Sequence, residues 1–331
     1  MISTLLIFPI IACILTLLIK NRKFNTFLVC LYAVVHFVIT VLLTLGYGEK
    51  SIPYFAVDNT NLIFLIVLSL VFFMVAVYNA GYVKNFEFPD KKISHYSFMI
   101  LIFVLSMTGT LLSTDLGLAW VLVEATTLSS AYLIYFNKTK HSIEAAWKYV
   151  FICSIGIALA FVGIILLNIS TGAVNSLSFA ELYSHASHFD LNWLKIAFVF
   201  MLFGFGAKMG LAPIHFWLPD AHSEAPSPIS ALLSACLLNS AFLVIVRVFK
   251  ILEIAGCADY ARLMLFVMGF LSLFVTAVFV YHIKNYKRML AYSSIENMGI
   301  LAIGTALGGV AFYAVILHLI GHSLAKASFF L

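Results

Sequence analysis

Two charged residues lie inside stretches of sequence that otherwise suit lipid. Glu124 occurs within LGLAWVLVEATTLSSAYLIYF, and Lys208 occurs within LKIAFVFMLFGFGAKMGLAP. A charge at the middle of a bilayer costs about 2.5–3.5 kcal/mol on insertion scales, so each residue is a functional candidate by default. Glu124 is either a protonatable site, the partner of a buried cation, or a structural hydrogen-bond acceptor for a neighbouring helix.

Lys208 has the chemistry of a proton switch. Burial disfavours the charged form of a lysine, whereas a nearby carboxylate favours it. If Glu124 is that carboxylate, moving it away expels the proton from the amine. A lysine that merely extends to the membrane surface fits less well, because apolar residues flank Lys208 on both sides and Pro213 interrupts the helix just after it.

The GFGAKMG segment around Lys208 does not match a nucleotide site. A P-loop requires a lysine after its last glycine and then a hydroxyl residue, whereas Lys208 precedes Gly210 and is followed by Met209. The third glycine also comes one residue too late for a dinucleotide fingerprint. Together with Pro213 and Pro219, the glycines instead indicate a broken membrane helix, which is tolerated where the backbone lines a wet cavity or is buried in protein.

Three titratable residues, His318, His322 and Lys326, follow one another at intervals of four in LHLIGHSLAKASFF. This spacing places them on one face of a helix. Histidine titrates near neutral pH, so the pattern favours a hydrated proton-relay face. Simple packing of the side chains is one alternative. A metal site is another, although no HExxH motif or third carboxylate ligand accompanies the two histidines.

Three further ionisable residues are weaker candidates for the same relay. Lys148 stands near the start of an apolar run and either joins the relay or extends to the interface. Glu296 is the only carboxylate in its run, and His215 lies near the end of another. The five cysteines form no Cys-x-x-Cys motif or Cys/His cluster, so nothing in the sequence indicates a metal, haem or iron–sulfur site in this chain.

The elements that must position these residues are membrane helices. Of the 331 residues, 63% are apolar and only 10% are charged, whereas soluble domains carry about 25% charged residues. The composition excludes a water-soluble protein and predicts an all-α polytopic membrane protein. The net charge of +5 comes from basic residues in short loops, so it indicates no nucleic-acid partner. Eleven runs are long enough to cross a bilayer, at 2–19, 25–46, 59–80, 95–113, 116–136, 145–168, 192–216, 228–250, 261–281, 287–307 and 310–331.

Loop charge predicts how the chain is oriented. With eleven spans, alternate loops share a side, and eleven basic residues fall on one side against five on the other. The positive-inside rule therefore places the first side in the cytoplasm and the N-terminus outside. The last run stops at HSLAKASFFL without a polar tail or cap, so we expect either a chain that is truncated at its C-terminus or an unusual C-terminal end.

Several stretches resemble the antiporter-like subunits of respiratory complex I, of multisubunit sodium/proton antiporters and of membrane-bound hydrogenases. The most specific is KMGLAPIHFWLPDAHSEAPSPISALLSA, and both RMLAYSSIENMGI and the His/Lys run at 318–326 fit as well. The likeness covers essentially the whole chain. The segments SSIENMG, HSEAPSPISALLS and LLNSAFLVIVR are most similar to the hydrogenase-4 component F type of the group-4 hydrogenases.

The resemblance implies a fold of fourteen spans, about eleven of which are present here. It divides the chain into a three-helix region at 1–94, a first five-helix unit at 95–252 with a broken seventh helix, and an incomplete, inverted second unit at 253–331. It also implies proton transfer along a hydrated axis in the middle of the membrane. The residues that match the carriers of the family are Glu124, Lys208, His318, His322 and Lys326.

One departure from the family concerns the eighth span. The family places a lysine or histidine where this sequence has Asn239, and an amide cannot carry the proton itself. We therefore expect the central part of the relay to depend on water or on another group, such as Lys148 or Glu296.

The function that the resemblance implies is that of a proton-translocating, non-redox subunit of a redox-linked complex in the inner (cytoplasmic) membrane. Other membrane and peripheral subunits would be its partners and would hold the nickel–iron and iron–sulfur centres, leaving this chain without a cofactor or catalytic centre. The alternatives are the equivalent subunit of NADH:quinone oxidoreductase, a subunit of a multisubunit antiporter for protons and sodium or another cation, and a passive membrane scaffold. Buried Glu124 and Lys208 argue against a scaffold, which gains nothing from charge in mid-membrane.

Overall fold

The computed structural model describes residues 1–84, 88–172 and 176–331, and within them the chain is almost wholly helical. Nine helices of this described part are long and apolar enough to cross a membrane. Each of the eleven predicted runs coincides with a helix, and the two outside those nine are α1, which has 17 residues, and the more polar α13. The all-α membrane fold is confirmed, whereas the number of crossings, the orientation and the division at 94 and 252 stay predictions.

The elements follow one another in a simple order. The first part of the chain contains α1 (Ile2–Leu18), α2 (Arg22–Thr44), a short antiparallel hairpin of β1 (Ser51–Ile52) and β2 (Phe55–Ala56), and α3 (Asn59–Lys84). The middle part contains α4 (Asp90–Leu112), α5 (Leu116–Ile134), α6 (Lys140–Thr171), α7 (Phe179–His185), α8 (Leu191–Met209), α9 (Trp217–Glu224), α10 (Ser227–Leu232), the π-helical turn η3 (Leu233–Leu237) and α11 (Leu238–Ile254). The last part contains α12 (Ala258–Val280), α13 (Tyr286–Leu307) and α14 (Val310–Phe330).

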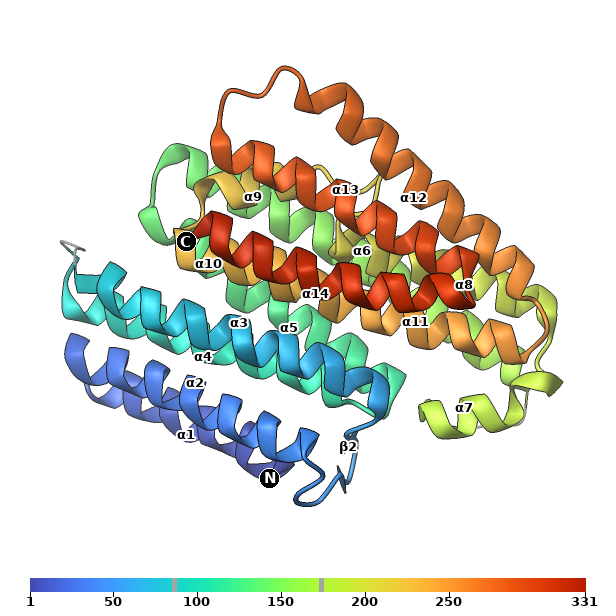
Figure 1. Ribbon diagram of the computed structural model, residues 1–331, viewed down its shortest axis with the longest axis horizontal. Helices are drawn as coiled ribbons and strands as arrows, with labels where there is room; N and C mark the ends of the chain where they lie inside the picture. The colour runs from blue at the N-terminus through green and yellow to red at the C-terminus, as the bar shows by residue number, and fades with distance from the viewer. Residues whose placement is uncertain (85–87, 173–175) are drawn as a thin grey trace.

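The long helices lie side by side, with α1 and α2 at one edge of the molecule and α12 and α13 at the other (Figure 1). α7 and β2 lie near one end of the helices, whereas α9 and the C-terminus lie near the opposite end. Large apolar side chains such as Phe151, Phe270 and Val310 are exposed on this bundle. Extensive exposed apolar surface of this kind is suited to contact with lipid or with other membrane subunits.

Polar residues explain where several helices begin. The side chains of Asp115, Thr139, Asp190 and Asn285 accept hydrogen bonds from backbone N–H groups in the first turns of α5, α6, α8 and α13. These caps satisfy N–H groups that a helix otherwise leaves without a partner. They fix the starts of α5 and α8, the two helices that carry the predicted acid and amine.

α6 and α8 approach closely because glycines line their contact. A Cβ atom at Gly204 would lie only 2.5 Å from the backbone nitrogen of Ala160 and 2.6 Å from the carbonyl oxygen of Gly156. A Cβ atom at Gly163 would similarly lie 2.8 Å from the backbone nitrogen of Met201. Small residues let membrane helices pack backbone against backbone. This contact places the last turn of α8, which carries Lys208, directly against α6.

α8 ends inside its predicted run. Gly210 closes the helix with a φ of +82°, a conformation that glycine adopts without steric cost. A short non-helical segment then leads into the separate helix α9, which ends before α10 begins at Ser227. The predicted break in the seventh span is therefore confirmed, and its residues match the Gly/Pro pattern of the sequence.

The next span is central and also irregular. α10, η3 and α11 form one run of 28 residues, Ser227–Ile254. In the most apolar part of this run, 94% of the residues are buried. π-helical turns insert an extra residue into a helix and frequently occur at functional sites. Asn239 lies just after this turn, so the turn affects the direction in which its amide points.

Candidate proton-transfer site

Lys208 is completely buried at the end of α8 and bonds to two neutral oxygen atoms. Its Nζ donates to Thr127 Oγ1 at 2.8 Å and to Tyr149 Oη at 2.6 Å. Thr127 belongs to α5 and Tyr149 to α6, and both side chains are also fully buried. The amine is thus held at the meeting point of three helices by hydroxyl groups.

Glu124 accepts hydrogen bonds from two hydroxyl groups. Thr127 Oγ1 donates to its Oε2 at 3.1 Å, and Ser154 Oγ of α6 donates to its Oε1 at 3.0 Å. Within the described residues, the ion pairs include none between Glu124 and Lys208. Whether Glu124 and Lys208 touch was left open by the sequence, and in the structure a hydroxyl bridge joins them, because Thr127 follows Glu124 by three residues on α5 and bonds to both charged groups.

The hydroxyl groups form a chain with one consistent direction. Thr127 accepts from Lys208 and donates to Glu124, so a single oxygen joins the amine to the carboxylate. Tyr149 also accepts from Lys208, which leaves its own O–H for Ser130 at 2.6 Å. Ser130 in turn donates to the carbonyl oxygen of Thr126. Each hydroxyl group in this network has an acceptor, and two of the three N–H groups of the Lys208 ammonium donate to described side chains.

The His/Lys face predicted on α14 exists, and its members differ in burial. Lys326 is buried and donates to the carbonyl oxygen of Leu290 at 2.9 Å. His318 is half-buried, and its Nε2 lies 2.7 Å from Asn297 Oδ1 on α13. His322 is 5% exposed, and neither of its ring nitrogens makes a hydrogen bond to a described protein group.

His222 on α9 is a buried titratable residue that the sequence did not single out. It has no exposed surface, its ring stacks on Phe330 with centroids 5.2 Å apart, and neither ring nitrogen bonds to a described group. The charged and titratable groups that act on it electrostatically are Lys326, Lys287 and His322. The broken helix therefore contributes a histidine to the cluster that the α14 face forms.

Asn239 joins the central span to this cluster. Its Nδ2 donates to Ser323 Oγ on α14 at 2.8 Å and to the carbonyl oxygen of Ala235 at 2.8 Å. Its buried Oδ1 makes no hydrogen bond to a described group. Ser323 directly follows His322 along α14, so the amide lies beside the histidine cluster.

The weaker candidates lie away from these two clusters or at their borders. Lys148 is at the surface, where its side chain is 45% exposed and pairs with Glu144 at 2.6 Å and with Asp220 of α9 at 3.0 Å. Glu296 is exposed on α13, and His215 is buried in the break between α8 and α9. Neither Lys148 nor Glu296 therefore lies in the buried network around Lys208.

Three groups of the site, Thr127, Tyr149 and His222, were not predicted from the sequence, although the sequence contained partial indications of them. Thr127 follows Glu124 by three residues, so it had to share a helix face with it. Tyr149 is next to Lys148 in sequence, but its side chain is buried whereas that of Lys148 is exposed. His222 stands in the polar segment DAHSE, which has the composition of an exposed loop.

Comparison with known proteins agrees with the fold of a transmembrane subunit. A family model described as NADH:quinone oxidoreductase/Mrp antiporter, TM, matches residues 113–331. The chain is 36% identical to the hydrogenase-4 component F homolog of Methylacidiphilum infernorum (isolate V4), over 99% of this chain and 71% of that protein. It is 30% identical to hydrogenase-4 component B of Escherichia coli (strain K12), over 83% of this chain and 42% of that protein.

A solved structure has the same arrangement of helices. It is that of the membrane-bound sulfane sulfur reductase, an archaeal respiratory membrane complex, in which one chain superposes with a TM-score of 0.87 at 24% identity. The match covers 99% of this chain and 69% of that chain. The relatives are named as components of larger assemblies, so other subunits are partners of this multi-pass membrane protein. The chain belongs to the NADH:quinone oxidoreductase/Mrp antiporter family of transmembrane subunits.

Proposed function

We propose that this chain moves protons through the cytoplasmic membrane as the antiporter-like subunit of a redox-linked complex of the group-4 hydrogenase type. The observation that supports this most directly is the Lys208–Thr127–Glu124 chain, in which one hydroxyl group joins a buried amine to a carboxylate. A polar chain of this kind inside a membrane protein costs free energy and is expected at a proton path. The name of the M. infernorum relative supports the hydrogenase assignment.

The proposed step between the two charged residues is a transfer through Thr127. The ammonium of Lys208 gives its proton to the Thr127 oxygen while the Thr127 hydroxyl gives its own proton to Glu124. Lys208 becomes a neutral amine, Glu124 becomes a neutral carboxylic acid, and Thr127 is unchanged. Both hydrogen bonds that the step needs are present, at 2.8 and 3.1 Å. The step requires no movement of a helix, because donor and acceptor are already aligned.

The proposed continuation runs through the histidine cluster. His222 and His322 are buried with ring nitrogens that make no hydrogen bond to described protein groups. Buried imidazole nitrogens need partners, and water is the partner that suits a proton path. Water between Lys208 and this cluster, beside the amide of Asn239, would take the place that a lysine has in other family members. Lys326 and His318 then extend the path along α14.

The redox chemistry is assigned to partner subunits. The cysteines of this chain are scattered along the sequence, and no group of three or more His, Cys, Asp or Glu in its described part could hold a metal ion. We propose that the nickel–iron and iron–sulfur centres of such a complex are held by its other subunits. The family name equally admits a subunit of a NADH:quinone oxidoreductase or of an antiporter.

The subunits that copurify with the chain would distinguish a hydrogenase from a NADH:quinone oxidoreductase. Sodium-dependent transport in the absence of a redox substrate would instead identify a sodium/proton antiporter.

The test is Lys208→Ala in the assembled complex, with proton movement followed in membrane vesicles during turnover. We expect pumping to be lost while electron transfer partly continues, because no other described ammonium lies between Thr127 and Tyr149. Lys91→Ala is the matched control, since Lys91 is exposed at the start of α4. Wild-type pumping by Lys208→Ala in a normally assembled complex would exclude the carrier role.

A further inference from the structure

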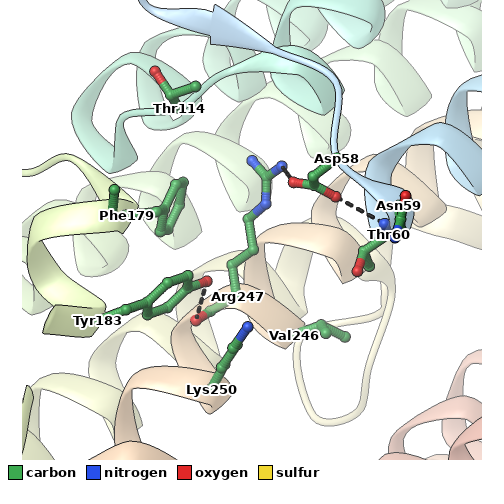
Figure 2. A pocket seen from close by; sticks show the side chains of 10 residues that line it. Asp58, Asn59, Thr60, Thr114, Phe179, Tyr183, Val246, Arg247 and Lys250 are labelled. Carbon is green, nitrogen blue, oxygen red and sulfur yellow. Dashed lines mark hydrogen bonds and ion pairs between the residues drawn. The ribbon is translucent and has the colours of Figure 1, made fainter. Parts of the chain in front are cut away.

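A cavity of about 360 Å³ lies at the end of the molecule where α7 is found, remote from the break between α8 and α9. Its walls come from four places in the chain: the first turn of α3, the α4–α5 connection, α7 and the end of α11 (Figure 2). All four lie on the side that the positive-inside rule predicts to face outward. None of them takes part in the Lys208 network.

Arg247 forms the inner wall of this cavity and is held rigidly. Its guanidinium pairs with Asp58 Oδ2 at 2.9 Å and donates to the carbonyl oxygen of Ser113, and its side chain is only 10% exposed. Its Cζ also lies 5.0 Å from the centroid of the Phe179 ring. These contacts join α3, α4 and α7 to α11. A cation fixed in this way is preorganised, so it loses little side-chain entropy when it contacts a ligand.

Lys250 adds a second cation one helical turn further along α11. It is exposed and lines the cavity, and its Nζ lies 4.9 Å from the centroid of the Tyr183 ring. Within the described residues, no carboxylate lies within ion-pairing distance of this amine. The lining therefore carries two cations but only one carboxylate, Asp58, and has a net charge of +1.

The remaining lining groups suit an anion with several oxygen atoms. The lining residues include Thr60 and Thr114, which have hydroxyl groups, and Asn59, which has an amide, and all three side chains can donate hydrogen bonds. Apolar walls come from Phe179 and Val246. The cavity thus combines cations and hydroxyl donors with an apolar wall, and it lies at the ends of membrane helices. This combination suits a molecule whose phosphate group enters the cavity while its apolar part lies against the lipid-facing surface.

We propose that this cavity binds a phosphate-bearing anion, supplied by an anionic phospholipid headgroup of the outer leaflet or by free phosphate. Lys250 and the spare donors of the cavity contact the phosphate oxygens, while Arg247 supplies a fixed positive wall. Bound there, the anion would tie α7 to α3 and α11. The site is independent of proton transfer, since no residue of the Lys208 network lines it.

The test uses Lys250→Gln in the purified complex that contains the full-length chain, after removal of lipid. Bound molecules are counted by native mass spectrometry during titration with phosphatidylglycerol, with phosphatidylcholine, or with inorganic phosphate. We expect preferential binding of phosphatidylglycerol, weakened about fivefold by Lys250→Gln, the loss expected for one basic residue at a membrane surface. Lys195→Gln is the matched control, because Lys195 also lies over a tyrosine ring on the same predicted side but outside the cavity.

The arms separate the two sources of phosphate. Displacement of phosphatidylglycerol by inorganic phosphate identifies the free anion as a ligand, and failure to displace it identifies the lipid. The proposal is wrong if Lys250→Gln binds phosphatidylglycerol as tightly as the wild type, or if Lys195→Gln loses as much. It is also wrong if phosphatidylcholine binds equally well. Crosslinks from position 250 to a neighbouring polypeptide that fills the cavity would overturn it too.

Discussion

Replacing Thr127 by valine tests whether its hydroxyl group joins Lys208 to Glu124. Valine has nearly the same shape, so Thr127→Val removes two hydrogen bonds from a fully buried site without opening a large cavity. A hydrogen bond to a charged group contributes about 1.5–3 kcal/mol. If about 2 kcal/mol of this stabilisation is lost from the transfer step, its rate falls about 30-fold. Tyr149 still bonds to Lys208, so the amine keeps a partner and the fold survives.

The assay measures proton uptake by membrane vesicles while the complex carries out its own electron transfer. Thr126→Val is the matched control, because Thr126 is equally buried on α5 but, among the described residues, its hydroxyl group bonds to the carbonyl oxygen of Val123 and to neither charged group. We expect Thr126→Val to pump at close to the wild-type rate. The bridge has no role in the path if Thr127→Val pumps normally in an intact complex. An equal loss in both variants would instead point to a general disturbance of α5.

Two further predictions concern the surroundings of Lys208. Tyr149→Phe removes the second acceptor of the amine but keeps the ring that packs on Trp217, so we expect an assembled complex with about tenfold slower proton uptake in vesicles; an unchanged rate would contradict this. Gly204→Ala places a methyl group against the α6 backbone and should lower stability by about 3 kcal/mol or prevent assembly. Thermal unfolding of the complex checks it, and Gly321→Ala, where no heavy atom lies within 4 Å of the added carbon, should unfold like the wild type.

The sequence predicted the parts of the fold that depend on local patterns. Apolar runs gave the positions of the helices, since a helix in lipid must satisfy its backbone within itself. The break after Lys208 followed from Gly210 and Pro213, which disfavour a continuous helix wherever they occur. The four-residue spacing of His318, His322 and Lys326 gave their common face for the same local reason. None of these inferences needed to know which helices are neighbours.

The parts that the sequence could not give depend on contacts between distant segments. Glu124 and Lys208 are separated by 84 positions, and whether they touch depends on how α5, α6 and α8 are placed relative to one another. The glycine contact holds α8 close to α6, which carries Tyr149, while Thr127 of α5 lies between the amine and the carboxylate. A threonine or tyrosine hydroxyl in a membrane helix often bonds to its own backbone, so composition alone does not mark one as a bridge.

His222 illustrates a different limit of sequence reasoning. Its segment looks like a polar loop, and its burial results from α14, whose Phe330 covers the ring more than a hundred positions later in the chain. A histidine in a loop is ordinarily solvated, whereas His222 is covered by α14, which packs against the segment that follows the break. The break therefore does more than interrupt a helix, because it lets α9 carry a titratable group into the space between α10 and α14.

The two buried clusters differ in a way that bears on the direction of proton movement. Beside Lys208 the Thr127 hydroxyl group already joins the amine to Glu124, so the protein alone defines this route. Around His222 and His322 four ring nitrogens make no bond to described protein groups, so the protein defines positions but not a route. Where hydrogen bonds between side chains already connect donor and acceptor, a proton moves whenever its free energy is lower on the acceptor. Where water must connect the side chains, a proton moves only while water is ordered between them. We therefore expect control over the path to lie at the histidine cluster and at α9, which ion pairs from Asp220 to Lys148 and Arg288 hold between α6 and α13.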